Sequence, residues 1–401
     1  MLKRLTGVLI CALAVASAQA QSVNKEVKIG VLTDMSGVYT DISGKGSILA
    51  ARMAVEDFGG KVLGKEIQVV TADHQNKPDL GNSIARKWFD LEGVDAIADL
   101  PNSAVALSVM NIAKEKNKVA MFSGSVSPDI TGKNCTAIST HWAYDTYALS
   151  NVTAKAMLKQ GSNTWYFITL DAMATAAFQR DATKMVEAGG GQVLGSIKHP
   201  LNSSDFSSFL LQAQASKAKV VALVNAGGDT VSAVKQASEF GVIKGGQKIV
   251  GLLMQINDVH GIGLNQVQGV VTAESFYWDT DEGTRAFSKR FMARHNGVPP
   301  NQIQAGVYSG VTHYLKAVAA ANTTDGAAVT KKMKELPVND FYAKNVSVRQ
   351  DGRVMRDFLL LQVKAPGESK GPWDYYKIMA RIPGAEAYRP LEEGGCPLVK
   401  N

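Results

Sequence analysis

Two kinds of hydrophobic pattern alternate along the first part of the chain. Short apolar runs without a clean polar alternation predict buried strands at 27–32, 66–72, 95–100 and 118–123. Between these runs, apolar residues recur every three or four positions and predict amphipathic helices, as in the set Leu80, Ile84, Trp88 and Leu91. Apolar strands that alternate with such helices predict βαβ units and a parallel sheet covered on both faces.

The same pattern restarts in the second part of the chain. Apolar runs predict strands at 164–170, 192–200, 219–226 and 248–254, with helices at 173–188 and 229–240. Two α/β halves of similar size predict two lobes, each with its own core. Beyond residue 272, two helical segments (EGTRAFSKRFMARH and AGVYSGVTHYLKAVAAA) and two strands (VMRDFLLLQVK and WDYYKIMARI) are expected to add to both lobes.

The first twenty residues have the pattern of a secretory signal peptide. Lys3 and Arg4 precede an apolar stretch at 5–16, and small residues stand at the cleavage positions in AQA at 18–20. The stretch is too short to cross a bilayer. We therefore expect residues 1–20 to be cleaved, and the mature, exported protein to begin at Gln21.

Charge and cysteine content change this picture only a little. The formal net charge of +7 falls when Lys3 and Arg4 are removed, and no run of five basic residues occurs, so we expect no nucleic-acid partner. The mature chain keeps Cys135 and Cys396. In an oxidising compartment these two cysteines are candidates for a disulfide.

The glycine-rich loop after the first strand does not have the spacing of a phosphate-binding loop. Six residues separate Gly37 from Gly44, and Gly46 follows Lys45 where a metal-binding hydroxyl is needed. The chain also lacks the nucleophile elbow of hydrolases, and its six histidines are too far apart to form a helical metal motif. We expect no enzyme activity, no cofactor and no metal, although ligands distant in sequence remain able to converge in the fold.

Small polar loops recur just past the strand ends. They read TDMSGVYTD, PNSA, SGSVSPD, LDAMAT, NAGGDT and MQIND. In open parallel sheets, ligands bind outside the carboxyl ends of the strands, and helix N-termini there favour a carboxylate. A simpler interpretation, in which these residues serve only as helix caps and turns, stays open for many of them.

At these loops the sequence resembles the periplasmic solute-binding proteins of ABC importers, in particular the branched-chain amino-acid (leucine/isoleucine/valine) binding family. The similar segments are KIGVLTDMSGVYTDISGKGSILAARMAVEDFGG, GKEIQVVTADHQNKPDLGNSIARKWFD and DFSSFLLQAQASKAKVVALVNAGGDTVSAVKQASEFG. The resemblance covers nearly the whole mature chain. It implies a monomer with the type I periplasmic-binding fold, which binds a small molecule by lobe closure and delivers it to a membrane ABC permease.

The resemblance also implies how the lobes divide. Lobe 1 is expected at 24–142 plus 275–345 and lobe 2 at 143–274 plus 346–380, joined by three crossovers. A tail at 381–401 is expected to return to lobe 1. The ligand-binding residues carried over from the family, together with the two methionines of an apolar wall, are Tyr39, Ile42, Asn102, Ser103, Gly124, Ser125, Asp171, Met173, Ala174, Asn225, Gly227, Asp229 and Met254.

Two departures from the family pattern bear on the ligand. Amino-acid binders of this type present an acidic residue to the ligand's ammonium group, but the matching place, LLMQ at 252–255, has none. Ala172 and Ala174 stand where relatives often carry a bulky aromatic residue. We expect a small carboxylate, with an aromatic or other apolar acid slightly ahead of a branched-chain amino acid. Asp229 would reverse that order if it faced the cleft.

Two further hypotheses remain. A sensory or regulatory ligand-binding protein could use the same fold, although the export signal argues against a cytoplasmic regulator. An exported α/β enzyme is the third hypothesis, and no nucleophile–base pair or metal motif supports it.

Overall fold

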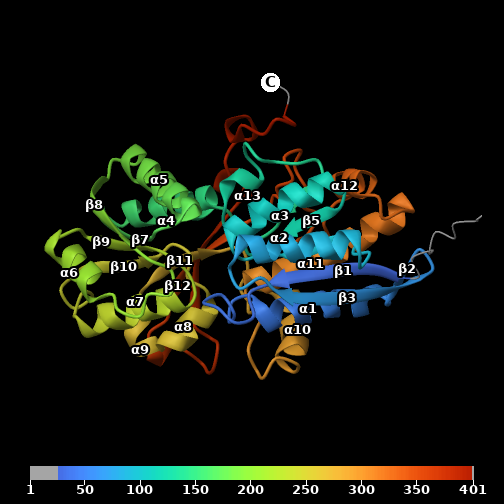
Figure 1. The fold of residues 1–401 in the computed structure, drawn as a ribbon. Helices are drawn as coiled ribbons and strands as arrows, with labels where there is room; N and C mark the ends of the chain where they lie inside the picture. The colour runs from blue at the N-terminus through green and yellow to red at the C-terminus, as the bar shows by residue number, and fades with distance from the viewer. Residues whose placement is uncertain (1–25, 400–401) are drawn as a thin grey trace, which may run out of the picture.

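The structure is a computed structural model that describes residues 26–399, and it consists of two α/β lobes side by side (Figure 1). The predicted signal peptide lies outside the described residues. Within 26–399, no helix combines the length and apolarity needed to span a membrane. The predicted fold class, two lobes with mostly parallel sheets, is confirmed.

The first lobe is built on a six-stranded sheet in the order β2-β3-β1-β4-β5-β6. All neighbours pair in parallel except β2, which forms an antiparallel edge with β3. The strands are β1 (Glu26–Thr33), β2 (Lys61–Val62), β3 (Lys65–Asp73), β4 (Ala96–Asp99), β5 (Val119–Phe122) and β6 (Ser139–His141).

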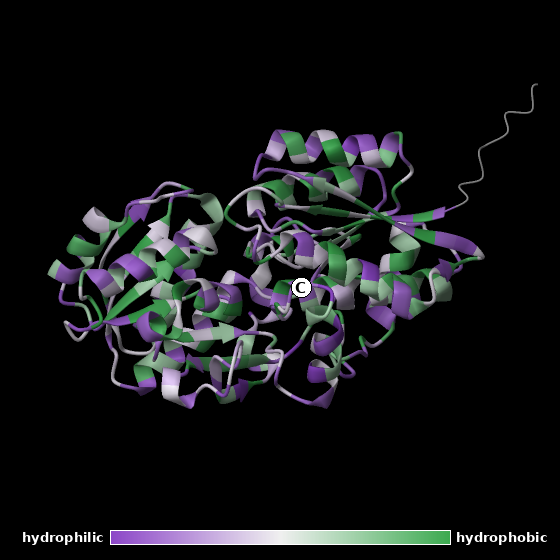
Figure 2. Cartoon of the chain, turned by 90° about the horizontal axis from the view of Figure 1, so that it is seen from below, coloured by the Kyte–Doolittle hydropathy of each residue, from purple (hydrophilic) through white to green (hydrophobic). Residues whose placement is uncertain are grey.

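Helices cover both faces of this sheet, so its central strands β1, β4 and β5 are almost entirely buried, whereas the outer strand β3 is partly exposed. One core includes side chains of α1 (Gly44–Phe58), α10 (Glu282–Met292), α11 (Gln302–Ala321) and α12 (Gly326–Glu335). The opposite core includes side chains of α2 (Pro78–Asp90) and α3 (Ser103–Glu115). In Figure 2 the helices alternate green and purple along their length, as expected for elements with one buried and one exposed face.

The second lobe has a seven-stranded sheet in the order β13-β12-β11-β10-β9-β7-β8. Five strands run parallel and the last two, β12 and β13, add antiparallel to one edge. The strands are β7 (Thr164–Leu170), β8 (Gln192–His199), β9 (Val220–Val224), β10 (Lys248–Gly251), β11 (Val271–Glu274), β12 (Phe358–Val363) and β13 (Tyr376–Ile382). Its helices are α4 (Thr146–Lys159), α5 (Met173–Ala188), α6 (Ser207–Ala215), α7 (Gly228–Glu239), α8 (Ile256–Ile262) and α9 (Leu264–Val267).

The chain passes between the lobes three times. The first passage follows β6, and the second lies between β11 and α10. For the third, the core of the first lobe still includes Val348 and Val354, beyond the expected division at 345/346, whereas Phe358 belongs to the core of the second lobe. The third passage therefore lies between Val354 and Phe358.

The tail after β13 contacts both lobes. The short helix α13 (Gly384–Ala387) packs on α4, where the Asn151 side chain donates hydrogen bonds to the carbonyls of Glu386 and Ala387. The tail then returns to the first lobe, where Cys396 forms a disulfide with Cys135, with 5.5 Å between their Cα atoms. The tail thus ties the far end of the chain to the loop between β5 and β6.

Candidate functional site

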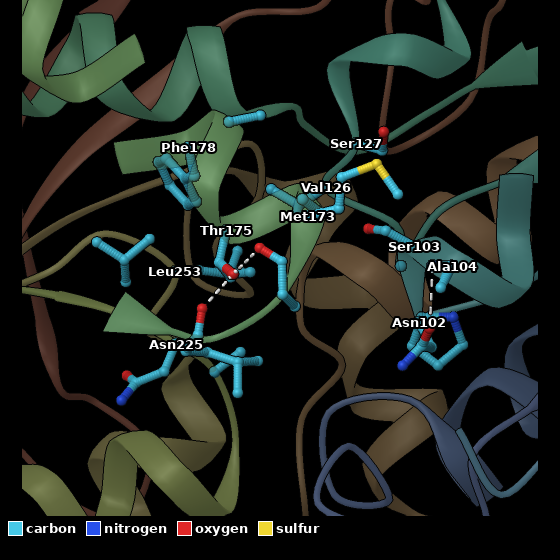
Figure 3. A pocket seen from close by; sticks show the side chains of 18 of the residues that line it. Asn102, Ser103, Ala104, Val126, Ser127, Met173, Thr175, Phe178, Asn225 and Leu253 are labelled. Atoms are coloured by element: carbon cyan, nitrogen blue, oxygen red, sulfur yellow. Dashed lines mark hydrogen bonds between the residues drawn. The ribbon is translucent and has the colours of Figure 1, made fainter. Parts of the chain in front are cut away.

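A cleft of about 310 Å³ lies between the lobes, at the carboxyl ends of strands from both sheets (Figure 3). Its volume suits a small organic molecule. The first lobe contributes Tyr39, Ile42, Pro101, Asn102, Ser103, Ala104, Leu107, Gly124, Val126, Ser127, Asp129 and Lys133, and the first crossover contributes Tyr144. The second lobe contributes Leu170, Asp171, Ala172, Met173, Ala174, Thr175, Ala177, Phe178, Arg180, Leu201, Val224, Asn225, Ala226 and Leu253.

Most of the residues expected from the sequence meet in this cleft. The structure brings together Tyr39, Ile42, Asn102, Ser103, Gly124, Asp171, Met173, Ala174 and Asn225. Ser125 lies just behind the wall, where its hydroxyl donates to the Ser103 hydroxyl at 3.1 Å. Three expected residues, Gly227, Asp229 and Met254, are not part of the wall.

Gly227 serves the contact between the lobes. Its φ is +60°, and a Cβ at this position would collide with the Val38 carbonyl oxygen of the first lobe. The neighbouring Gly228 N–H donates to that same oxygen at 3.2 Å. A glycine is required here because two backbones approach closely in a conformation that side chains disfavour.

Asp229 does not line the cleft. Its side chain is buried, and a carboxylate oxygen accepts a hydrogen bond from the Asn202 N–H at 3.3 Å. Burial raises the pKa of this carboxyl to about 6, although hydrogen bonds from the backbone of Asn202 and Ser203 oppose the shift. The carboxylate is therefore engaged by a turn of its own lobe.

Met254 also points away from the cleft. It is fully buried and packs over Gly251 in the core beneath the sheet. The preceding residue, Leu253, lines the cleft in its place. The apolar wall is thus formed by leucine at 253, and the structure places Met254, which was expected there, outside the cleft.

The first glycine-rich loop is organised around a single carboxylate. Asp34 accepts hydrogen bonds from the N–H groups of Gly37 at 2.7 Å and Tyr39 at 3.0 Å, and from the Asn76 side chain at 2.7 Å. These amides are consumed within the protein, so they do not form a phosphate cradle. Their role is to place the Tyr39 ring in the cleft.

The turn after β4 has an unusual backbone. Asp99 and Leu100 adopt φ angles of 84° and 59°, which are costly for residues other than glycine. The Asp99 carboxylate accepts a hydrogen bond from the Ser43 hydroxyl, and its carbonyl accepts from the N–H groups of Ser123 and Gly124. This network holds the turn that delivers Asn102 to the cleft.

We expect Asp99→Asn to change the pH dependence of stability. Burial raises the pKa of the Asp99 carboxyl from 3.8 to about 6. Folding therefore favours the protonated acid, and wild-type stability falls by about 3 kcal/mol as the pH rises from about 4 to about 6. Asparagine does not titrate, so the variant lacks this pH-dependent loss. The unfolding free energy of the variant minus that of the wild type should therefore increase by about 3 kcal/mol between about pH 4 and pH 6. Denaturant unfolding at a series of pH values measures the difference, and parallel profiles for the two proteins would contradict the expectation.

Two helix N-termini face the cleft, and they differ in their caps. At α3, Asn102 Oδ1 accepts from the N–H groups of Ala104 at 3.0 Å and Val105 at 3.2 Å. At α5, no side chain caps the first turn, and the N-cap residue is Ala172. The N-terminus of α5 therefore keeps backbone donors available to an anion.

Aromatic side chains form the apolar part of the cleft. Tyr39 comes from the first loop, Tyr144 from the first crossover and Phe178 from α5. The Tyr144 hydroxyl donates to the Gly124 carbonyl at 2.9 Å, which fixes its ring. Our sequence reasoning missed Tyr144 and Phe178. For Phe178 a signal existed, because it lies four residues after Ala174 and hence on the same helix face.

The carboxylates that line the cleft are already paired with lysines. Asp129 lies 3.3 Å from Lys133, and Asp171 lies 2.8 Å from Lys198. With no acidic residue at 252–255, the described part of the cleft wall presents no buried, unpaired carboxylate. Among the residues at 26–399, no group of three His, Cys, Asp or Glu side chains is arranged to hold a metal ion.

Comparisons with known proteins agree with this architecture. A family model described as periplasmic binding protein matches residues 26–371. A crystal structure of a periplasmic binding protein from Burkholderia mallei is 49% identical, with a TM-score of 0.90, and covers 94% of this chain and 100% of its own. A branched chain amino acid ABC transporter periplasmic ligand-binding protein from Burkholderia xenovorans is 40% identical, with a TM-score of 0.84. It covers 93% of this chain and 99% of its own.

A third solved structure shares the fold at lower identity. It is a solute binding protein of an ABC transporter from Rhodopseudomonas palustris, in complex with benzoate. It is 19% identical, with a TM-score of 0.80, and covers 89% of this chain and 97% of its own.

Proposed function

The chain belongs to the periplasmic binding protein family, and on that premise we propose that it is the substrate-binding component of an ABC importer. It captures a small carboxylate between its lobes, in the periplasm, and delivers it to a membrane permease. The favoured ligand is an aromatic or similarly bulky apolar acid. The observation that carries this proposal is a cleft that combines free anion donors with aromatic walls and lacks an unpaired buried carboxylate.

Donors for the ligand's carboxylate come from both lobes. The first lobe offers the Ser103 hydroxyl, which accepts from the Ser125 hydroxyl behind it, and the side-chain amide of Asn102, whose oxygen is used as the helix cap. The second lobe offers the uncapped backbone at the start of α5. Hydrogen bonds to an ionised acceptor are stronger than neutral ones, and the helix dipole adds to them.

The apolar end of the ligand would contact the aromatic side of the cleft. Tyr39, Tyr144 and Phe178 supply ring surfaces, and Val126 and Leu253 supply aliphatic surface. Aromatic side chains pack well against a ring in stacked or edge-to-face geometry. The small side chains of Ala172 and Ala174 leave room on the second-lobe wall.

An ammonium group would lack a partner in this cleft. Asp129 and Asp171 are paired with lysines, and Asp229 is engaged by its own lobe. A buried ammonium without an anion costs several kcal/mol, which is enough to remove micromolar affinity. This is the reason for placing an aromatic acid ahead of an amino acid.

A branched-chain amino acid is the second candidate. The 40% identical Burkholderia xenovorans protein is described as a branched chain amino acid ABC transporter component. The fold itself also accommodates an aromatic acid, as the benzoate complex from Rhodopseudomonas palustris illustrates. The two candidates differ in the ammonium group as well as in the shape of the apolar part, and the ammonium gives the sharper test.

Calorimetric titration of the purified protein tests the proposal. We expect benzoate or a hydroxybenzoate to bind and leucine to give no heat. Ser103→Ala should weaken binding of the aromatic acid by about tenfold, because a hydrogen bond to a charged group is lost. Ser204→Ala, an exposed serine outside the cleft, is the matched control.

Asp229→Asn separates the two candidates. Binding of the aromatic acid should survive this substitution, since the Asp229 side chain is directed to Asn202 and not to the cleft. Tight leucine binding that Asp229→Asn abolishes would overturn the ligand order and assign the ammonium to Asp229.

A further inference from the structure

We propose that a second cavity, at the crossovers between the lobes, binds a small oxyanion of the sulfate or phosphate type. This cavity of about 190 Å³ is separate from the cleft and shares no lining residue with it. Its wall includes Thr280 and Asp281 from the second crossover, Tyr342, Lys344 and Arg356 around the third, and Arg381 from β13. The proposal rests on these contacts and is independent of the solute.

Arg356 is the central feature of this cavity. Its side chain is 8% exposed, and its guanidinium carbon lies 3.5 Å from the centre of the Tyr342 ring. One terminal nitrogen, Nη1, donates to the Tyr342 carbonyl, while the buried Nε has no hydrogen-bond partner. Most of the donors of this buried group are therefore unused by the described protein.

No carboxylate in the described part of the chain neutralises Arg356. The other charges around the cavity are already paired, because Lys344 lies 3.0 Å from Asp281 and Arg381 lies 3.9 Å from Asp357. The stack on the Tyr342 ring offsets only part of the cost of a buried charge. After these pairs are formed, one positive charge remains at the cavity without a counterion.

An oxyanion would pair with the uncompensated charge and the unused N–H donors of Arg356. Buried charges are costly unless they are paired and hydrogen-bonded, and the planar fork of a guanidinium fits two oxygens of one anion. Sulfate and inorganic phosphate present such oxygens and are small enough for this cavity. The nearby Lys344 ammonium, 68% exposed at the rim, would add a weaker attraction.

The test is a titration of the full-length mature protein with sodium sulfate, followed by calorimetry and by thermal unfolding. Sodium chloride at equal ionic strength is the reference, and sodium phosphate is the second probe. Sulfate also stabilises proteins generally, so binding at this cavity is judged from the difference between the wild-type protein and the variants. Arg356→Gln should weaken sulfate binding by at least about tenfold, because the charge and the fork are both removed. Arg86→Gln, which removes an exposed arginine paired with Glu115 on the outer surface, should leave it unchanged.

Lys344→Gln keeps the proposal testable if Arg356→Gln does not fold. Lys344 is largely exposed, so its removal should not harm folding. The substitution should weaken sulfate binding by about threefold. Binding of sulfate no stronger than that of chloride in the wild-type protein would overturn the proposal. So would an unchanged sulfate affinity in a folded Arg356→Gln protein, or in Lys344→Gln.

Discussion

Replacing Arg353 with methionine should lower the free energy of unfolding by about 3–5 kcal/mol, because it leaves a buried carboxylate without its partner. Arg353 is fully buried, and its Nη2 donates to Asp145 at 2.8 Å. The same nitrogen contacts the His141 ring, and Nη1 donates to the His141 carbonyl at 3.3 Å and the Tyr144 carbonyl at 3.4 Å. Chemical denaturation of the variant and the wild-type protein measures the loss.

The position of Arg353 connects this stability to the cleft. It joins the segment just before the third crossover to the start of the first, and its guanidinium carbon lies 4.7 Å from the centre of the Tyr388 ring in the tail. Its partner His141 makes a 2.7 Å hydrogen bond with the Ser125 carbonyl, directly behind the cleft wall. Burial, with the adjacent arginine, holds the pKa of His141 well below its usual range, so this ring is neutral and accepts from Arg353. We therefore expect solute affinity to fall together with stability.

Two further variants separate the buried charge from the packing. Arg353→Met combined with Asp145→Asn should recover part of the lost stability, because the Asp145 carboxylate that has lost its partner is also removed. Arg86→Met, which breaks an exposed ion pair with Glu115 at 3.2 Å, should cost less than about 1 kcal/mol. A loss below 1 kcal/mol in Arg353→Met itself would show that the crossovers do not depend on this charge.

Removal of the disulfide should have an effect of similar size. The bridge joins residues 261 positions apart, and the chain-entropy model assigns a loop of this length a stabilisation of about 5 kcal/mol. We expect Cys135→Ser with Cys396→Ser to lower the unfolding free energy by up to about that amount. A reducing agent should destabilise the wild-type protein and leave the double variant unchanged, which provides the internal control.

The disulfide also supports one wall of the cleft. The tail packs closely on the segment before Cys135, since a Cβ at Gly132 would lie 2.8 Å from the Gly394 carbonyl oxygen. Ser127, Asp129 and Lys133 of this segment line the cleft. Solute affinity in the double variant should therefore decrease. Equal stability of the oxidised and reduced wild-type protein would show that the tail is held by packing alone.

The architecture could be predicted from the sequence because it follows from local periodicity. Apolar runs such as 27–32 and 164–170 are largely buried, and Trp88 of the predicted helical stripe packs on one face of the first sheet. Leu91, the last residue of that stripe, is instead 79% exposed just beyond the end of the helix. Both patterns record burial at the level of single elements. The polar loops at the strand ends follow from the same topology, so Asn102, Ser103 and Asn225 could be placed near one another in advance.

The direction of individual side chains could not be predicted in this way. Leu253 and Met254 are neighbours just beyond β10, and a change of one residue decides which of them faces the cleft and which packs on Gly251. Asp229 lies in the first turn of α7, at the edge of the sheet where the sequence places the site. Its carboxylate nevertheless accepts a hydrogen bond from the Asn202 N–H. Such choices depend on which partner lies on each side of the backbone, and a single sequence does not contain that information.

The sequence by itself therefore determined the two lobes and the small polar residues at their strand ends, because these follow from patterns only a few residues long. The cleft between the lobes was implied by the family resemblance. Only the tertiary structure decided which charges are paired. Arg353 meets Asp145, more than two hundred positions away, whereas Arg356, three residues further on, meets no carboxylate in the described chain. The free energy of a buried charge depends on what surrounds it in space, and those surroundings exist only once distant segments have packed together.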